Sequence, residues 1–193
     1  RLRRQVPYLV RVTGPDIPGF EKRYTWVYRI LTPLIRRIWR SSTILVAKCT
    51  PEAQMVENVD RSVSVSIVPN GVDLERFCPC PTTEERIRER RALGFEQTDE
   101  VSLCIGGVFP RKGVEILTEA WDTLSRERPD ARLVIIGSRN ENQSKYRDYL
   151  RLIDEQVQES AHPNRVLFAG EVRDPERYLR CADVFAFPSR REG

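Results

Sequence analysis

The chain lacks any long apolar run. Of its 193 residues, 40% are hydrophobic and 31% are charged, and no stretch approaches the roughly 18 consecutive apolar residues that a membrane-spanning helix requires. No segment shows the pattern of a signal peptide either. The composition is that of an ordinary globular protein, with room for one domain or for parts of two. We therefore expect a cytoplasmic location.

Histidine and methionine are scarce, and the cysteines are not paired in a recognisable motif. Histidine and methionine each occur once, and the five cysteines include no pair with the two-residue spacing of a zinc knuckle or a redox motif. No pair of aspartates has a metal-binding spacing. We therefore expect reduced thiols and neither a metal nor a cofactor.

Acidic residues are rare at the start of the chain. The first forty residues hold ten Lys/Arg against only Asp16 and Glu21, which leaves a local charge of +8, whereas the whole chain carries +4. Such a basic end attracts phosphates or an anionic membrane surface. No recognised nucleic-acid-binding motif accompanies the charge, so nucleic acid is not an expected partner.

A basic amphipathic helix is predicted in the same region. The segment Arg23–Arg40 has apolar residues at helical spacing and five arginines. In one interpretation the apolar stripe packs on a sheet and the arginines face water; in the other the helix lies on an anionic membrane. We expect the stripe to pack, and we expect peripheral contact with the inner membrane surface through the arginines.

Short apolar runs alternate with helical patterns along the whole chain. We predict strands at 8–13, 43–47, 63–69, 101–106, 131–137, 165–170 and 183–188, with helices between most of them. This alternation predicts an α/β fold with parallel sheets that are covered by helices. Ligands bind such sheets at the carboxyl ends of the strands. The proline-containing, highly charged stretch 78–98 marks the expected domain boundary.

The loop "GGVFPRKG", Gly106–Gly113, lies between a predicted strand and a predicted helix. Its glycines allow a ligand close to the backbone, and the helix start supplies unpaired amides and a positive dipole end. Arg111 and Lys112 add two cations. The combination indicates a phosphate site or, alternatively, a solvated basic turn. Its spacing matches neither a Walker loop nor a dinucleotide fingerprint.

Three other segments are candidates with two interpretations each. In "TGPDIPGF", Gly14 and Asp16 either orient a hydroxyl-bearing acceptor or shape and cap a turn. The segment "VPNGVDLERF" is either a structural hinge, which we favour, or a ligand contact. Glu192, after the last strand, either accepts hydrogen bonds from sugar hydroxyls or is an exposed surface residue.

Taken in order, "VPNGVDLERF", "GGVFPRKGVEILTEAWDTL", "RPDARLVIIG", "RVLFAGEV" and "YLRCADVFAFPSRREG" resemble the retaining glycosyltransferases of family 4. The resemblance implies the GT-B fold, in which two Rossmann-like domains face each other. Residues 1–77 would then be the C-terminal part of the acceptor-side domain, 78–98 the linker region, and 99–193 the first part of the nucleotide-sugar donor domain. Because the chain starts at Arg1 and ends within this pattern, we expect an internal fragment.

The resemblance also implies roles for particular residues. Lys112 would contact the donor diphosphate, with Arg111 beside it, and Glu192 would bind donor-sugar hydroxyls as the first of two family glutamates. The second glutamate would fall beyond Gly193. The other residues expected at the donor are Gly106, Gly107, Gly113, Gly170, Glu171, Val172 and Ser189. Gly107 stands where many members have an arginine, and Thr13-Gly14 where many have a histidine.

The implied reaction is transfer of a sugar from a nucleoside-diphosphate sugar to an acceptor hydroxyl, with retention and without a metal. The acceptor would be a saccharide or a lipid-linked molecule, in glycan, glycolipid or cell-envelope polysaccharide synthesis. The alternatives are a nucleotide-sugar epimerase or phosphorylase of the same fold, and a non-catalytic nucleotide-sugar binding module. We expect the fragment alone to be inactive.

Overall fold

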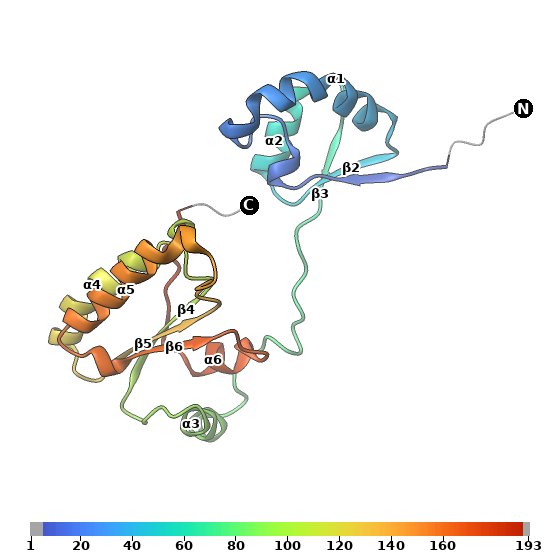
Figure 1. The fold of residues 1–193 in the computed structure, drawn as a ribbon. Helices are drawn as coiled ribbons and strands as arrows, with labels where there is room; N and C mark the ends of the chain where they lie inside the picture. The colour runs from blue at the N-terminus through green and yellow to red at the C-terminus, as the bar shows by residue number, and fades with distance from the viewer. Residues whose placement is uncertain (1–5, 191–193) are drawn as a thin grey trace, which may run out of the picture. The chain divides into compact units, whose positions relative to one another are not determined.

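The chain forms two compact units that divide between Val72 and Asp73. The computed structural model describes residues 6–190, except for the side chain of Lys22. Each unit has its own parallel sheet with helices against it (Figure 1). The predicted α/β fold with parallel sheets is therefore confirmed.

The first unit is built on three parallel strands in the order β1-β2-β3. These are β1 (Leu9–Arg11), β2 (Ile44–Ala47) and β3 (Val65–Ile67), joined by α1 (Thr25–Ser41) and α2 (Thr50–Val59). Short 3-10 turns lie at Gly14–Asp16 and Lys22–Tyr24. Both helices lie on the same face of the sheet (Figure 1), as right-handed crossovers between strands added in one direction require.

The core of this unit lies between that sheet face and the two helices. Trp39 of α1 and Val56 of α2 pack with Leu45 and Ala47 of β2, and all four are almost fully buried. On the opposite face, Leu9 and Ile44 lie side by side in register and remain exposed.

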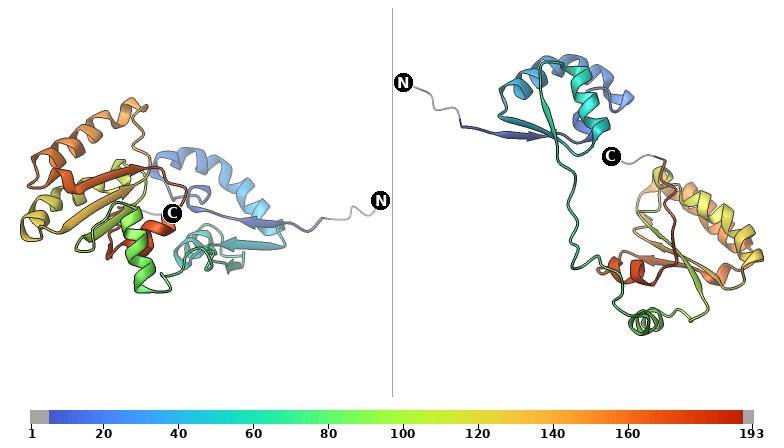
Figure 2. Two further views of the ribbon diagram at one scale, coloured as in Figure 1. Left: turned by 90° about the horizontal axis from the view of Figure 1, so that it is seen from below. Right: turned by 180° about the vertical axis from the view of Figure 1, so that it is seen from behind.

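The second unit has four parallel strands in the order β6-β5-β4-β7. They are β4 (Glu100–Ile105), β5 (Ala131–Ile136), β6 (Val166–Gly170) and β7 (Val184–Phe185). Helices α4 (Val114–Glu127) and α5 (Arg147–Glu159) cover one face, and α3 (Thr83–Ala92) and α6 (Pro175–Cys181) lie on the other (Figures 1 and 2). Single 3-10 turns occur at Pro110–Lys112, Ser144–Tyr146 and Pro163–Arg165.

Alternating residues of β5 supply the two cores of this unit. Leu133 and Ile135 pack with Trp121 on the side of α4 and α5. Val134 and Ile136 pack on the other side, with Cys181 of α6. Successive side chains of a strand point to opposite faces, so a continuous apolar run fits a sheet that is covered on both faces.

The stretch 78–98 contains α3, which is tied to the second unit by charged groups. Arg86 and Arg90 pair with Asp183, just before β7, at 2.8 and 3.1 Å. Upstream of this stretch, Arg76 pairs with Glu176 of α6 at 2.9 Å. Arg180 of α6 donates to the carbonyl of Cys78 at 2.9 Å. These contacts fasten the start of the second unit to α6 and to the residue before β7.

Between residues 6 and 190, no helix combines the length and the apolar content that crossing a bilayer requires.

Candidate functional site

The strand order of the second unit has a switch point between β4 and β7. From β4 the chain continues through α4 to β5, which lies on one side of β4. After β6 it returns through α6 to β7, which lies on the other side of β4. In open parallel sheets, ligands bind outside the carboxyl ends of the strands where the order reverses in this way. Two segments border this point: the loop Gly106–Gly113 after β4, and Pro188–Arg190 after β7.

These two segments touch through their backbones. The backbone N–H of Arg190 donates to the carbonyl of Arg111 at 2.9 Å. The hydroxyl of Ser189 lies 3.3 Å from the same oxygen and donates to it. The structure thus brings Ser189 together with the loop of Arg111 and Lys112, although 77 positions separate Lys112 from Ser189 in the chain.

Gly113 allows this contact. It has a left-handed φ of +68° and forms the N-cap of α4, directly after the turn Pro110–Lys112. A Cβ atom at this position would lie 2.4 Å from the carbonyl oxygen of Pro188. Any side chain would therefore push the two segments apart, in addition to straining the backbone.

Arg111 and Lys112 are the two cations of the predicted phosphate site, and they lie beside the N-terminus of α4. The stem of Lys112 passes over Gly106, with its Cδ 3.4 Å from where a Cβ of that glycine would stand. Its amino nitrogen lies 5.2 Å from the ring centroid of Phe187, and the guanidinium of Arg111 lies 5.4 Å from that of Phe109. Fixed cations beside a helix N-terminus form an arrangement suited to an anion.

Cys104, near the end of β4, is a buried thiol whose pKa is shifted by its surroundings. Burial raises the pKa of its thiol to about 11, and the charge of Lys112 acts in the opposite direction. Cys104 is 2% exposed. This thiol is therefore part of the core beneath the loop and offers no nucleophile to a ligand there.

Gly137 joins the site although the predicted site residues do not include it. A Cβ there would lie 2.3 Å from the carbonyl oxygen of Gly106, and its N–H donates to the carbonyl of Gly170 at 2.8 Å. The glycines that follow or end β4, β5 and β6 therefore form one continuous edge. The signal in the sequence is the ending "IIG" of one strand, which matches "CIG" of its neighbour.

The remaining donor-side candidates lie at or near the same edge. A Cβ at Gly107 would meet the Phe109 ring at 2.5 Å. Gly170, at the end of β6, has a φ of +68° and open space around its Cα. Glu171 after it is exposed, while Val172 packs against the core. Glu192 lies outside the described residues.

The acceptor-side candidates belong to the first unit. The carboxylate of Asp16 accepts hydrogen bonds from the N–H and the hydroxyl of Thr13 at 3.2 and 2.6 Å. Gly14 is buried under the ring of Phe20. The structure therefore gives Asp16 a turn-capping role and Gly14 a packing role; a role toward an acceptor stays a prediction.

Within the part of the chain that the structure describes, no three side chains of the metal-binding types are grouped to hold an ion. The prediction that no metal is needed is not tested by this observation.

Solved structures share this fold. The complex of Anabaena HepE with UDP superposes with a TM-score of 0.75, at 19% identity, over 96% of this chain and 47% of that one. A crystal structure of WaaG, described as a glycosyltransferase of lipopolysaccharide biosynthesis, gives a TM-score of 0.66 at 22% identity, over 88% of this chain and 45% of that one. The fold is accordingly of the GT-B type.

A curated relative is the GDP-mannose-dependent monoacylated alpha-(1-6)-phosphatidylinositol monomannoside mannosyltransferase of Corynebacterium glutamicum. It is 37% identical over 128 residues, which cover 65% of this chain and 31% of that protein. The chain thus matches about a third of its length. The model of the family "Glycosyl transferases group 1" matches residues 85–193, more than half of the chain. The chain therefore belongs to the group 1 glycosyl transferases.

Proposed function

We propose that the full-length protein is a retaining glycosyltransferase of family 4. It transfers a sugar from a nucleoside-diphosphate sugar to an acceptor hydroxyl, in glycan, glycolipid or cell-envelope polysaccharide synthesis. The observation that carries this proposal is the contact of Ser189 with the loop that holds Arg111 and Lys112, beside the N-terminus of α4 and at the switch point between β4 and β7. Family membership supports it.

The difficult step of such a transfer is the build-up of charge on the departing diphosphate. Lys112, Arg111 and the first amides of α4 are placed to stabilise that charge without a metal ion. The Lys112 stem lies over Gly106, just after β4. Losing one such preorganised donor costs about 2.7–4 kcal/mol, or roughly 10²–10³ in rate.

The base of the nucleotide is proposed to lie near Gly170, Glu171 and Val172. The relative from Corynebacterium is named for GDP-mannose, whereas the HepE complex contains UDP. Both nucleotides are therefore the probes for the first experiment, which is calorimetric titration of each into the full-length protein.

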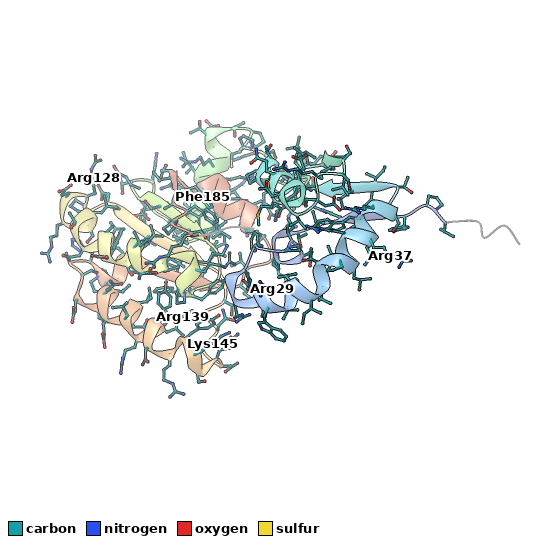
Figure 3. The ribbon with its side chains drawn as sticks, turned by 90° about the horizontal axis from the view of Figure 1, so that it is seen from above. Arg29, Arg37, Arg128, Arg139, Lys145 and Phe185 are labelled. Atoms are coloured by element: carbon teal, nitrogen blue, oxygen red, sulfur yellow. The ribbon has the colours of Figure 1, made fainter. Side chains whose placement is uncertain are left out.

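The decisive variant is Lys112→Ala, with Arg128→Ala as the control. Arg128 is an exposed cation that pairs with Glu100 at the opposite end of β4 (Figure 3). We expect saturable binding of one nucleotide that Lys112→Ala nearly abolishes and Arg128→Ala leaves intact. Binding that survives Lys112→Ala in a folded protein contradicts the proposed site. Turnover of the donor without an acceptor would instead favour an epimerase.

We further propose that the enzyme acts in the cytoplasm at the inner membrane surface, on a saccharide or lipid-linked acceptor. The exposed face of α1 supports this. The expectation that its apolar stripe packs on the sheet is correct only in part, because Trp39 is buried and Ile35 packs beside it. Trp26, Ile30 and Leu34 are 69%, 69% and 56% exposed, and their four-residue spacing forms an outward stripe.

Arg29 and Arg37 are exposed on the same helix (Figure 3), and Arg37 is three residues from Leu34 along the stripe. Arg36 and Arg40 are engaged within the unit: Arg36 donates to the Val59 carbonyl and Arg40 pairs with Asp60. An exposed apolar stripe with tryptophan and free-standing cations is typical of a helix that lies in the interface of an anionic bilayer.

Co-sedimentation with vesicles tests the membrane contact in the full-length protein. Each basic residue near an anionic surface contributes about 1 kcal/mol, so Arg29→Ser with Arg37→Ser should weaken binding by roughly 30-fold. Arg126→Ser with Arg128→Ser, which changes the charge equally on the second unit, is the control. Equal binding to zwitterionic vesicles, or no loss in high salt, contradicts the proposal.

A further inference from the structure

Three charged or polar side chains meet beside the candidate site from three separate elements. Glu115 lies in the first turn of α4, Tyr149 in the first turn of α5, and Arg190 after β7. A guanidinium nitrogen of Arg190 lies 2.5 Å from one carboxylate oxygen of Glu115. The Tyr149 hydroxyl donates to the other oxygen. Both oxygens of Glu115 are therefore occupied.

Burial and contacts with Tyr149 hold Glu115 in place, separately from its contact with Arg190. Its side chain is only 14% exposed, and its backbone N–H donates to the Tyr149 oxygen at 3.3 Å. Burial, and then the hydrogen bond to Glu115, raise the pKa of Tyr149. The phenol therefore stays protonated and remains a donor. The carboxylate is left with one oxygen directed at Arg190, in a short charge-assisted contact.

Arg190 transmits this contact to the loop of the proposed donor site. Its backbone N–H donates to the carbonyl of Arg111, and two residues earlier Pro188 lies against Gly113. Arg111 and Gly113 flank Lys112 in the chain. The position of the segment Pro188–Arg190 therefore sets the position of the Lys112 backbone.

Arg190 also neutralises the negative charge of Glu115, which would otherwise repel an anionic ligand. The carboxylate of Glu115 lies in the first turn of α4, the same helix end that is proposed to face a diphosphate. Without Arg190 this carboxylate loses its ion-pair partner, and its negative charge repels the ligand. With Arg190 it serves as an anchor.

We propose that Glu115 and Arg190 are positioning residues for the donor diphosphate: Glu115, held by Tyr149, fixes Arg190 and through it the backbone on both sides of Lys112. This inference rests on the proposed function, because it needs a nucleoside diphosphate at that loop. The residues themselves do not touch the reacting atoms in the proposal.

A double-mutant cycle tests the proposal in the full-length protein, with GDP and UDP as probes in calorimetry. We expect Arg190→Ala to weaken nucleotide binding about tenfold, since it removes the ion-pair partner of the Glu115 carboxylate. Glu115→Ala should weaken it less. The double variant should bind no more weakly than Arg190→Ala alone, because the repelling charge is then gone. In donor turnover the loss should appear in KM more than in kcat.

Two further variants separate positioning from general stability. Tyr149→Phe keeps the packed ring, removes the hydroxyl and should weaken binding about threefold. Glu100→Ala breaks a pair of the same chemistry, Glu100 with Arg128 at 3.2 Å, at the other end of the sheet, and should leave binding unchanged.

The outcomes distinguish this inference from the proposed function. If Lys112→Ala abolishes nucleotide binding while Glu115→Ala and Arg190→Ala bind as tightly as the wild type, the positioning role is wrong and the donor site stands. Independent, multiplicative effects in the double variant also overturn it. If the folded wild type binds neither nucleotide, the proposed donor site itself fails.

Discussion

Gly113→Ala adds a single methyl group at the contact between the loop after β4 and the segment after β7, and the structure predicts a large effect. The backbone at Gly113 has a left-handed φ of +68°, which costs alanine about 1–2 kcal/mol. A less flexible unfolded chain offsets about 0.4–1 kcal/mol of this. The new Cβ would lie 2.4 Å from the Pro188 carbonyl oxygen, and such overpacking adds about 1–3 kcal/mol.

The clash has a consequence for ligand binding beyond stability. Real Cβ atoms essentially never come closer than 3.0 Å, so the 2.4 Å contact must open by at least 0.6 Å. The loop of Lys112 or the segment of Ser189 has to move by that distance. A misplacement of about 1 Å can lower a catalytic rate roughly 100-fold, and we expect the displaced loop also to weaken nucleotide binding, by at least tenfold.

Gly94→Ala is the matched control. Gly94 also has a left-handed φ, +77°, but no atom lies within 4 Å of its added Cβ. We expect Gly94→Ala to cost about 1 kcal/mol in urea unfolding and to leave nucleotide binding unchanged. We expect Gly113→Ala to cost about 2–4 kcal/mol and to impair binding. Equal effects of the two variants on binding would refute the argument from the clash.

Three further predictions concern the rest of the fold. The Asp99 carboxylate is fully buried between Arg165 at 2.6 Å and Arg132 at 3.2 Å, so Asp99→Ala should destabilise the protein by about 3–5 kcal/mol in urea unfolding; a cost below 1 kcal/mol contradicts this. The hydrogen bonds from Arg40 and Ser62 hold the pKa of Asp60 well below its ordinary value, so the pair stabilises the fold above about pH 4 and this contribution is lost as the pH falls further. Arg40→Gln should therefore unfold more easily at pH 7, and its difference from the wild type should shrink toward pH 2; a constant difference excludes the linkage. Burial raises the pKa of Cys104 and of Cys181 to about 11, so iodoacetamide at pH 8 should spare both in the native protein and label them after unfolding, with the more exposed Cys49 as the internal comparison.

The sheets of both units could be predicted from the sequence because their signal is local. A buried parallel strand is a short continuous apolar run, and its crossover helix is an amphipathic stretch beside it. "ARLVIIG" and "EILTEAWDTL" carry these signals within single segments. The loop Gly106–Gly113 could be singled out in the same way, since glycines, cations and a helix start are adjacent in the chain.

The candidate site depends on contacts between segments far apart in the chain. Arg190 pairs with Glu115, 75 positions earlier in the chain. Neither periodicity nor composition predicts such a pair. The same holds for Gly137, which shows its importance only where a Cβ would meet the backbone of Gly106. On α1, helical spacing predicted an apolar stripe, but only packing decided that Trp39 is buried and that Trp26 is exposed.

The sequence by itself therefore determined the alternation of strands and helices, the parallel sheets and the glycine-rich basic loop, because each follows from residues close together in the chain. Only the tertiary structure decided which strand lies beside which. The order β6-β5-β4-β7 places the loop after β4 against the segment after β7. That order is set by how the two faces of the sheet are covered, and it is what turns two separate loops into one candidate site.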